Sequence, residues 1–297
     1  MHAKPEILAF FDEPTNTVTY LAADPATGAA AVIDPVLDFD QASARIGTAS
    51  AEAVLQAAAA RGWRIEMVLE THAHADHLSG AKLIAARTGA WIGIGALITE
   101  VQATFAPMFG ADDVLPDGRD FDRLLQDGEV VPLGDLAITV MHTPGHTAAC
   151  ISFRVADAVF VGDTLFMPDY GTARTDFPGG DAHALYRSIR RLLALPNATR
   201  LFLCHDYKGP DRSAYIWETT VGAQRQGNVQ AHDGIDEGAF VALRQARDAT
   251  LTPPRLLLPS IQVNIRGGRL PPADAHGNRA LRLPLRAGDA GAATLLS

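Results

Sequence analysis

The chain has few cysteines, no excess of basic residues and no long apolar run. Its two cysteines, Cys150 and Cys204, are too few for a disulfide framework, which favours a reducing compartment. With 25 Lys and Arg against 34 Asp and Glu, the formal net charge is -9, a poor match for the phosphate backbone of a nucleic acid. The apolar runs are too short to span a bilayer, which argues against a membrane protein.

The N-terminal residues also lack the features of a secretory signal. Residues 1–6 contain no charged segment that an apolar segment follows. At 297 residues, 47% hydrophobic and 20% charged, the chain can bury a sizeable core, in one larger α/β unit or in about two average domains. We therefore expect a soluble cytoplasmic protein without nucleic-acid or membrane partners. The oligomeric state stays open, and a homodimer is one option.

Short apolar segments and helical segments follow one another through most of the chain, the pattern of an α/β protein. After about residue 250 the sequence becomes rich in Pro, Gly and Arg. This composition predicts a catalytic domain over residues 1–250 and a tail, 251–297, that packs on it without a core of its own. We expect strands at 17–21, 29–33, 65–69, 91–94, 137–141, 151–155, 158–161 and 201–204, helices at 51–61, 78–87, 97–105 and 182–195, and loops or short hairpins over 110–135.

The stretch Thr71–His77, THAHADH, gathers three imidazoles and one carboxylate within seven residues. It follows the apolar strand predicted at 65–69 and precedes a predicted helix. Open α/β layers place their sites at such strand ends, where a turn lets neighbouring side chains converge. The candidate residues are His72, His74, Asp76 and His77.

Three further ligand-type residues also follow predicted strands: His146, Asp163 and His205. Imidazole and carboxylate together suit zinc, iron or manganese. Any one of them alone could have a purely structural role, because a single His more often makes hydrogen bonds than binds a metal, and Asp often caps a turn. Their repeated placement at four strand ends favours a metal site. We expect the remaining candidates to be structural or exposed: His142, His183, His232, His276, and Cys204, whose thiol strand alternation would direct to the opposite face.

The order HxHxDH, His, Asp, His resembles that of the metallo-β-lactamase superfamily over roughly residues 7–210. This resemblance implies an αββα sandwich with metal in a cleft at one edge of the two sheets. Superfamily membership does not fix the reaction. In its binuclear members, one metal would take His72, His74 and His146, the other would take Asp76, His77 and His205, and Asp163 would bridge them.

The segment Ala173–Phe177, ARTDF, and the segment His205–Tyr207, HDY, resemble those of the ETHE-type persulfide dioxygenases. That resemblance implies oxidation of glutathione persulfide with O2 to sulfite and glutathione at one Fe(II) per chain. The implied iron ligands are His72, His146 and Asp163. By the same resemblance, Arg174 and Tyr207 bind glutathione, and the second shell comprises His74, Asp76, His77 and His205.

Two departures from that family stand out. Ala173 occupies a position that is usually Gly before the Arg, and the chain beyond residue 230 is longer than in compact members. The run Asn264–Leu270 either folds back near the site or packs on the body. The alternative function is a binuclear zinc hydrolase of thioesters or lactones, similar to hydroxyacylglutathione hydrolases. We expect the Pro- and Gly-rich tail to differ from their helical C-terminal domain, which weighs against the hydrolase.

Overall fold

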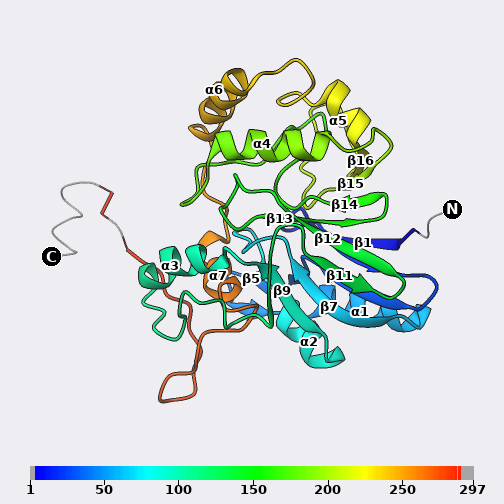
Figure 1. The fold of residues 1–297 in the computed structure, drawn as a ribbon. Coiled ribbons are helices and arrows are strands. Elements are labelled where there is room, and N and C mark those ends of the chain that lie inside the picture. The colour runs from blue at the N-terminus through cyan, green and yellow to red at the C-terminus, as the bar shows by residue number, and fades with distance from the viewer. Residues whose placement is uncertain (1–3, 286, 289–297) are drawn as a thin grey trace.

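Two six-stranded sheets pack face to face in the computed structural model, which describes residues 4–285 and 287–288 (Figure 1). The first sheet starts as an antiparallel meander and continues as parallel strands that helices connect. Parallel pairing needs such crossovers, which carry the chain across one face of the sheet. Its order is β1 (Glu6–Asp12), β2 (Thr17–Ala23), β3 (Ala29–Ile33), β7 (Arg64–Glu70), β9 (Trp91–Gly95) and β10 (Arg123–Leu125).

The second sheet is antiparallel except where one pair of strands runs parallel. That parallel pair is β14 with β15, and the segment between them contains a long amphipathic helix. The strand order is β11 (Val130–Leu133), β12 (Leu136–His142), β13 (Ile151–Val155), β14 (Ala158–Phe160), β15 (Arg200–Phe202) and β16 (Glu218–Thr220). Two short pairs complete the strands: β4 (Val36–Leu37) with β8 (Leu78–Ser79), and β5 (Phe39–Asp40) with β6 (Arg45–Ile46).

Helices cover the outer face of each sheet, so the layers are helix, sheet, sheet, helix (Figure 1). The first sheet packs against α1 (Ala49–Arg61), α2 (Ala81–Thr88), α3 (Ile98–Met108) and α7 (Leu257–Asn264). The second packs against α4 (Ala182–Leu193), α5 (Val221–Gly227) and α6 (Glu237–Asp248). The expected αββα sandwich is thereby confirmed.

The core between the sheets is rich in aromatic side chains. Tyr20 packs against Phe160 and Phe202 with ring centroids 5.2 and 5.5 Å apart. Its buried hydroxyl donates a hydrogen bond of 2.6 Å to the carbonyl of Leu203. This bond ties β2 to the segment after β15, and both lead to the same edge of the sandwich.

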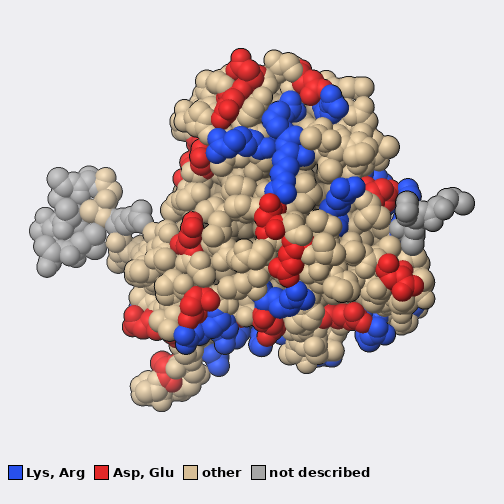
Figure 2. Space-filling view, viewed as in Figure 1, with Lys and Arg blue, Asp and Glu red and all other residues tan. Residues whose placement is uncertain are grey.

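Charged side chains are interspersed on the face drawn in Figure 2, where basic side chains over α4 lie next to acidic ones. Arginines of this helix pair with acids from other parts of the chain. Arg187 lies 3.4 Å from Glu237, and Arg191 lies 2.8 Å from Asp127. Among the described residues, no helix is long and apolar enough to cross a membrane.

Several element predictions need correction. The helix expected at 78–87 begins only at Ala81, because Leu78 and Ser79 pair with β4. The segment 110–135 contributes β10 to the first sheet in addition to loops. The tail is partly helical, since α7 lies within it and Ile261 joins the core of the first sheet. The domain boundary at residue 250 remains a prediction.

Candidate metal centre

Four loops at one edge of the sandwich bring the ligand-type residues together. THAHADH follows β7, whereas His146, Asp163 and His205 follow β12, β14 and β15. The three imidazole residues of THAHADH are at most 1% exposed, and Asp163 is 7% exposed. The sheets therefore gather residues from distant parts of the sequence into one buried cluster.

Two glycines allow the loops to approach their neighbours closely. Gly145, before His146, has φ of +140°, and an added Cβ would lie 2.3 Å from Cα of Leu185. Gly162, before Asp163, has φ of +51°, and its Cβ would lie 2.6 Å from Oγ1 of Thr71. Both positions need glycine because of the backbone conformation and the lack of space.

His72, His146 and Asp163 form one group whose potential ligand atoms all lie within 4.8 Å of one another. Nδ1 of His146 lies 2.8 Å from the carbonyl of Arg174. A carbonyl only accepts, so Nδ1 carries the proton and Nε2 is free to ligate. Thr71 Oγ1 donates to Asp34 and therefore accepts from Nδ1 of His72, 3.0 Å away, which frees His72 Nε2 as well.

In His77 and His205, too, Nδ1 faces an oxygen acceptor. Nδ1 of His205 lies 3.1 Å from the carbonyl of Asn16, and Nδ1 of His77 lies 3.2 Å from Oδ2 of Asp76. Nε2 of His205 is 3.2 Å from Oδ1 of Asp163 and 3.5 Å from Oδ2 of Asp76. These residues therefore form a second set of potential ligands that adjoins the first across Asp163.

In His74 it is Nε2, and not Nδ1, that faces acceptors. Its Nε2 lies 3.0 Å from Asp34 and 3.6 Å from Glu70, both buried carboxylates. Its Nδ1 has no hydrogen-bond partner among the described residues. A carboxylate that fixes one nitrogen of a ligating histidine is a common arrangement around metals. Sequence reasoning did not single out Asp34 or Glu70, although each lies at the end of a strand next to the cluster.

The unpaired atoms of the cluster fit a metal. Buried polar atoms in folded proteins nearly always have a partner, and a missing ion is one explanation for a group that lacks one. In the part of the chain that the structure describes, six ligand-type atoms of these residues lack a hydrogen-bond partner: Nε2 of His72, His74, His77 and His205, Nδ1 of His74, and Oδ1 of Asp163. Nitrogen and carboxylate donors of this kind suit zinc and iron alike.

The charges within the cluster keep Asp163 ionised. Burial would raise the pKa of Asp163, but the imidazoles of His205 and His146 hold it well below its usual range. Burial also lowers the pKa of His72, and the charge of His74 lowers it further. An anionic carboxylate and a neutral imidazole are the forms that bind metals. The pKa of His205 rises to about 10, because the carboxylates of Asp163 and Asp76 outweigh its burial.

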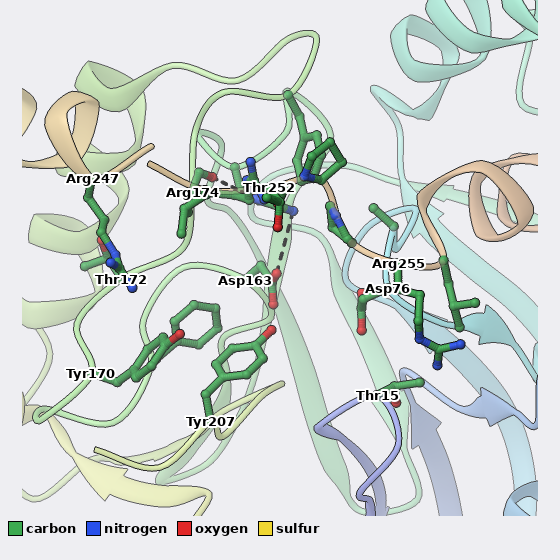
Figure 3. A pocket seen from close by; sticks show the side chains of 18 of the residues that line it. Thr15, Asp76, Asp163, Tyr170, Thr172, Arg174, Tyr207, Arg247, Thr252 and Arg255 are labelled. Carbon is green, nitrogen blue, oxygen red and sulfur yellow. Dashed lines mark hydrogen bonds and ion pairs between the residues drawn. The ribbon is translucent and has the colours of Figure 1, made fainter. Parts of the chain in front are cut away.

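A cavity of about 390 Å³ lies over this cluster, and Asp76, His146 and Asp163 form part of its lining (Figure 3). Tyr207 also lines it. The Tyr207 ring packs 5.0 Å from Tyr170 and points towards Asp163 in the view of Figure 3. The cavity therefore places an aromatic wall beside the proposed ligands.

Arg174 also lines the cavity, but its guanidinium is already engaged. It donates two hydrogen bonds of 2.6 Å to the carboxylate of Asp176 and one of 2.8 Å to the carbonyl of Thr252. The role of Arg174 towards a substrate stays a prediction.

The tail contributes contacts that its composition did not predict. Residues 251–256 line the cavity, and α7 places Asn264 against the THAHADH loop. Asn264 Nδ2 donates bonds of 2.8 Å to the carbonyls of His74 and His77. Of the two readings of the run Asn264–Leu270, folding back near the site is the observed one. The tail therefore no longer weighs against a hydrolase.

Cys204 is buried, as expected, but its thiol does not point away from the cluster. It lies 3.7 Å from Oδ2 of Asp34 and within one group of potential ligands with His74 and His205. Burial raises the pKa of this thiol well above its ordinary value, and the charge of Asp34 raises it further. The neutral thiol is a poor metal ligand in that state.

Comparison with known proteins agrees with the metal-binding pattern. The profile of the metallo-beta-lactamase superfamily matches residues 12–205. A probable metallo-hydrolase of Burkholderia pseudomallei is 51% identical over 94% of this chain and 98% of its own length. Glyoxylase B2 of Dictyostelium discoideum is 41% identical over 96% of this chain and 98% of its own. The crystal structure of ETHE1 from Myxococcus xanthus has a TM-score of 0.72 and 28% identity, and covers 89% of this chain and 100% of its own.

Proposed function

The chain belongs to the metallo-β-lactamase superfamily, and from this premise we propose that it is an iron-dependent persulfide dioxygenase. The proposed reaction converts glutathione persulfide, O2 and water to glutathione, sulfite and two protons. The sulfane sulfur is oxidised, O2 is reduced, and the S–S bond breaks so that the glutathione sulfur leaves as a thiol. The likeness to ETHE1 over most of both chains supports this reading.

The observation that carries the proposal is the group of two histidines and one carboxylate, His72, His146 and Asp163. A face of this composition with open positions is typical of non-haem Fe(II) oxygenases. Among the described residues, His74 falls into other groups and not into one with His72 and His146. We therefore assign the iron to this trio. Bound iron would supply electron transfer to O2, which zinc cannot do.

The residues around the trio have supporting roles in this proposal. The carbonyl of Arg174 and the hydroxyl of Thr71 fix the ring orientations of His146 and His72. Tyr207 borders the place where the persulfide sulfur would lie, and its ring would shield that sulfur from solvent. Asp76 and His205 lie next to Asp163 and can hold a water molecule or proton there.

The alternative is a binuclear zinc hydrolase of a glutathione thioester or a lactone. One specific observation favours it, since His77 and His205 also present unpaired Nε2 atoms beside Asp76. The names of the Burkholderia and Dictyostelium relatives point the same way. If the hydrolase acts on the thioester, both proposals have a substrate derived from glutathione.

The two functions can be separated in one set of assays. Metal-free protein is reloaded with Fe(II) without oxygen, or with Zn(II), and each form is given glutathione persulfide and S-lactoylglutathione. The dioxygenase proposal predicts O2 uptake and sulfite only with the iron form and the persulfide. Thioester hydrolysis by the zinc form with no O2 uptake by the iron form would instead support the hydrolase.

A further inference from the structure

The cavity over the metal cluster contains four arginines, and they differ in whether a protein acid already pairs with them. Arg174 is engaged by Asp176 and by the carbonyl of Thr252. Arg244 is buried and lies 2.8 Å from Asp248, and it also donates to the carbonyl of Thr172. Both guanidiniums are therefore committed to the fold.

Arg247 and Arg255 are exposed, and within the described chain neither side chain makes a hydrogen bond or an ion pair. Arg247 lies in the last turn of α6, and Arg255 lies in the segment between α6 and α7. In Figure 3, Arg247 extends beside Thr172, and Arg255 lies on the opposite side of Asp163. The two guanidiniums thus lie on opposite sides of the cluster of potential metal ligands.

The acids of the cavity do not neutralise these two charges. Asp76 accepts from Thr17 at 2.9 Å and from the ring of His77, and Asp163 faces His146 and His205. Two of the arginines that line the cavity, Arg244 and Arg247, lie on the same helix, α6. The pKa of Arg244 is lowered, chiefly because the side chain is buried, and the charge of Arg247 lowers it further. The pKa of Asp40 is lowered chiefly by the Ser43 hydroxyl, and the charge of Arg255 adds a small effect in the same direction.

We infer that Arg247 and Arg255 determine substrate specificity by each binding one carboxylate of an anionic thiol carrier. This inference rests on the proposed function and deepens it. A glutathione conjugate carries two carboxylates, one at each end, with the sulfur between them. An arginine on each side of the cluster would hold both ends and leave the sulfur over the ligands. A guanidinium suits a carboxylate because it can donate two parallel hydrogen bonds.

The experiment measures binding without turnover, so it does not depend on which reaction the protein performs. The iron-loaded protein is titrated by calorimetry with S-methylglutathione and with the same compound esterified at its glycyl carboxylate. The variants are Arg247→Gln and Arg255→Gln, and each is repeated as the Lys variant, which keeps the charge and loses the paired donors. Arg119→Gln is the matched control, because Arg119 is an exposed arginine outside the cavity that pairs with Asp117.

We expect each Gln variant to raise the Kd of S-methylglutathione about tenfold, the effect of one lost charge-assisted hydrogen bond at a solvent-exposed site. The Lys variants should fall between wild type and Gln, and Arg119→Gln should bind like wild type. With the ester, one of the two Gln substitutions should lose its effect, and that arginine is the one that binds the glycyl carboxylate.

The inference is overturned if both Gln variants bind the probe as tightly as Arg119→Gln does, or if wild type does not bind the probe. It is also overturned if both substitutions keep their full effect with the ester. That result would indicate long-range electrostatic attraction and no contact between one arginine and the glycyl carboxylate. A protein that binds the probe as predicted but consumes no O2 with persulfide would contradict the dioxygenase proposal and leave the two arginines in place. O2 uptake by both Gln variants with unchanged KM and Kd would contradict the role of the two arginines and leave the dioxygenase proposal in place.

Discussion

Asn264 gives the sharpest test of how the fold supports the metal centre. Asn264 is 3% exposed, and its side chain makes three hydrogen bonds of 2.8 Å to the THAHADH loop and to strand β8, which follows it. Two run to the carbonyls of His74 and His77, and the third comes from the amide of Ser79. Asn264→Ala removes all three and leaves three backbone groups without this partner.

The expected cost has two parts. Three buried hydrogen bonds at about 1 kcal/mol each, with some penalty for unpaired backbone groups, amount to roughly 3–5 kcal/mol of unfolding free energy. The second part is a loss of metal affinity, because the hydrogen bonds that hold the loop with His72 and His74 in place are removed. Loss of such outer contacts weakens metal binding by about 10–100-fold.

The chain offers a matched control on the same helix. Gln262 is 2% exposed, and its side chain also makes three hydrogen bonds, to Leu258 and to both backbone groups of Arg282. None of these partners belongs to the THAHADH loop. Gln262→Ala should therefore lower the melting temperature by a similar amount and leave metal affinity unchanged.

The assay is competition for the metal against a chelator of known affinity, with thermal unfolding of each variant in parallel. We predict weak metal binding for Asn264→Ala and near-wild-type binding for Gln262→Ala at comparable stability. Equal metal affinity in the two variants would refute the reasoning, because the helix would then stabilise the fold without positioning the ligands.

Other substitutions test further parts of the account. Asp163→Ala should abolish stoichiometric iron by elemental analysis and stop turnover, and a variant that keeps its iron contradicts the ligand assignment. Asp76→Ala should keep one iron per chain if the centre is mononuclear, whereas a binuclear hydrolase would lose its second metal. Gly145→Ala should lower the unfolding free energy by on the order of 3 kcal/mol in a denaturant titration, because the added Cβ meets the backbone of Leu185; normal stability would show that the loop can move. Arg174→Ala should retain iron and chiefly raise KM, and an unchanged KM would assign Arg174 to its ion pair with Asp176 alone.

The candidate ligands could be recognised because so many imidazole and carboxylate side chains are unusual at the ends of strands. No core pattern calls for THAHADH, and the same logic identified His146, Asp163 and His205 before any contact was known. The structure brings these residues together at one edge of the sheets. Which of them ligate stays a prediction.

The parts that sequence reasoning missed depend on long-range contacts. Asn264 and His74 are 190 positions apart, and an Asn in a short helix has no local feature that predicts the loop it contacts. Cys204 was placed on the wrong face because β15 ends at Phe202, so strand alternation no longer applies to it. Arg255 looked like one of many arginines in a Pro-rich tail, and only the fold brings it to the cavity.

The central claim is a single iron held by His72, His146 and Asp163 that oxidises a persulfide. The most direct measurement is elemental analysis of protein purified without added metal, combined with O2 consumption on glutathione persulfide. The account predicts about one iron per chain and O2 uptake that yields sulfite. About two zinc ions per chain, with no O2 uptake even after reloading with Fe(II), would contradict it and favour hydrolysis.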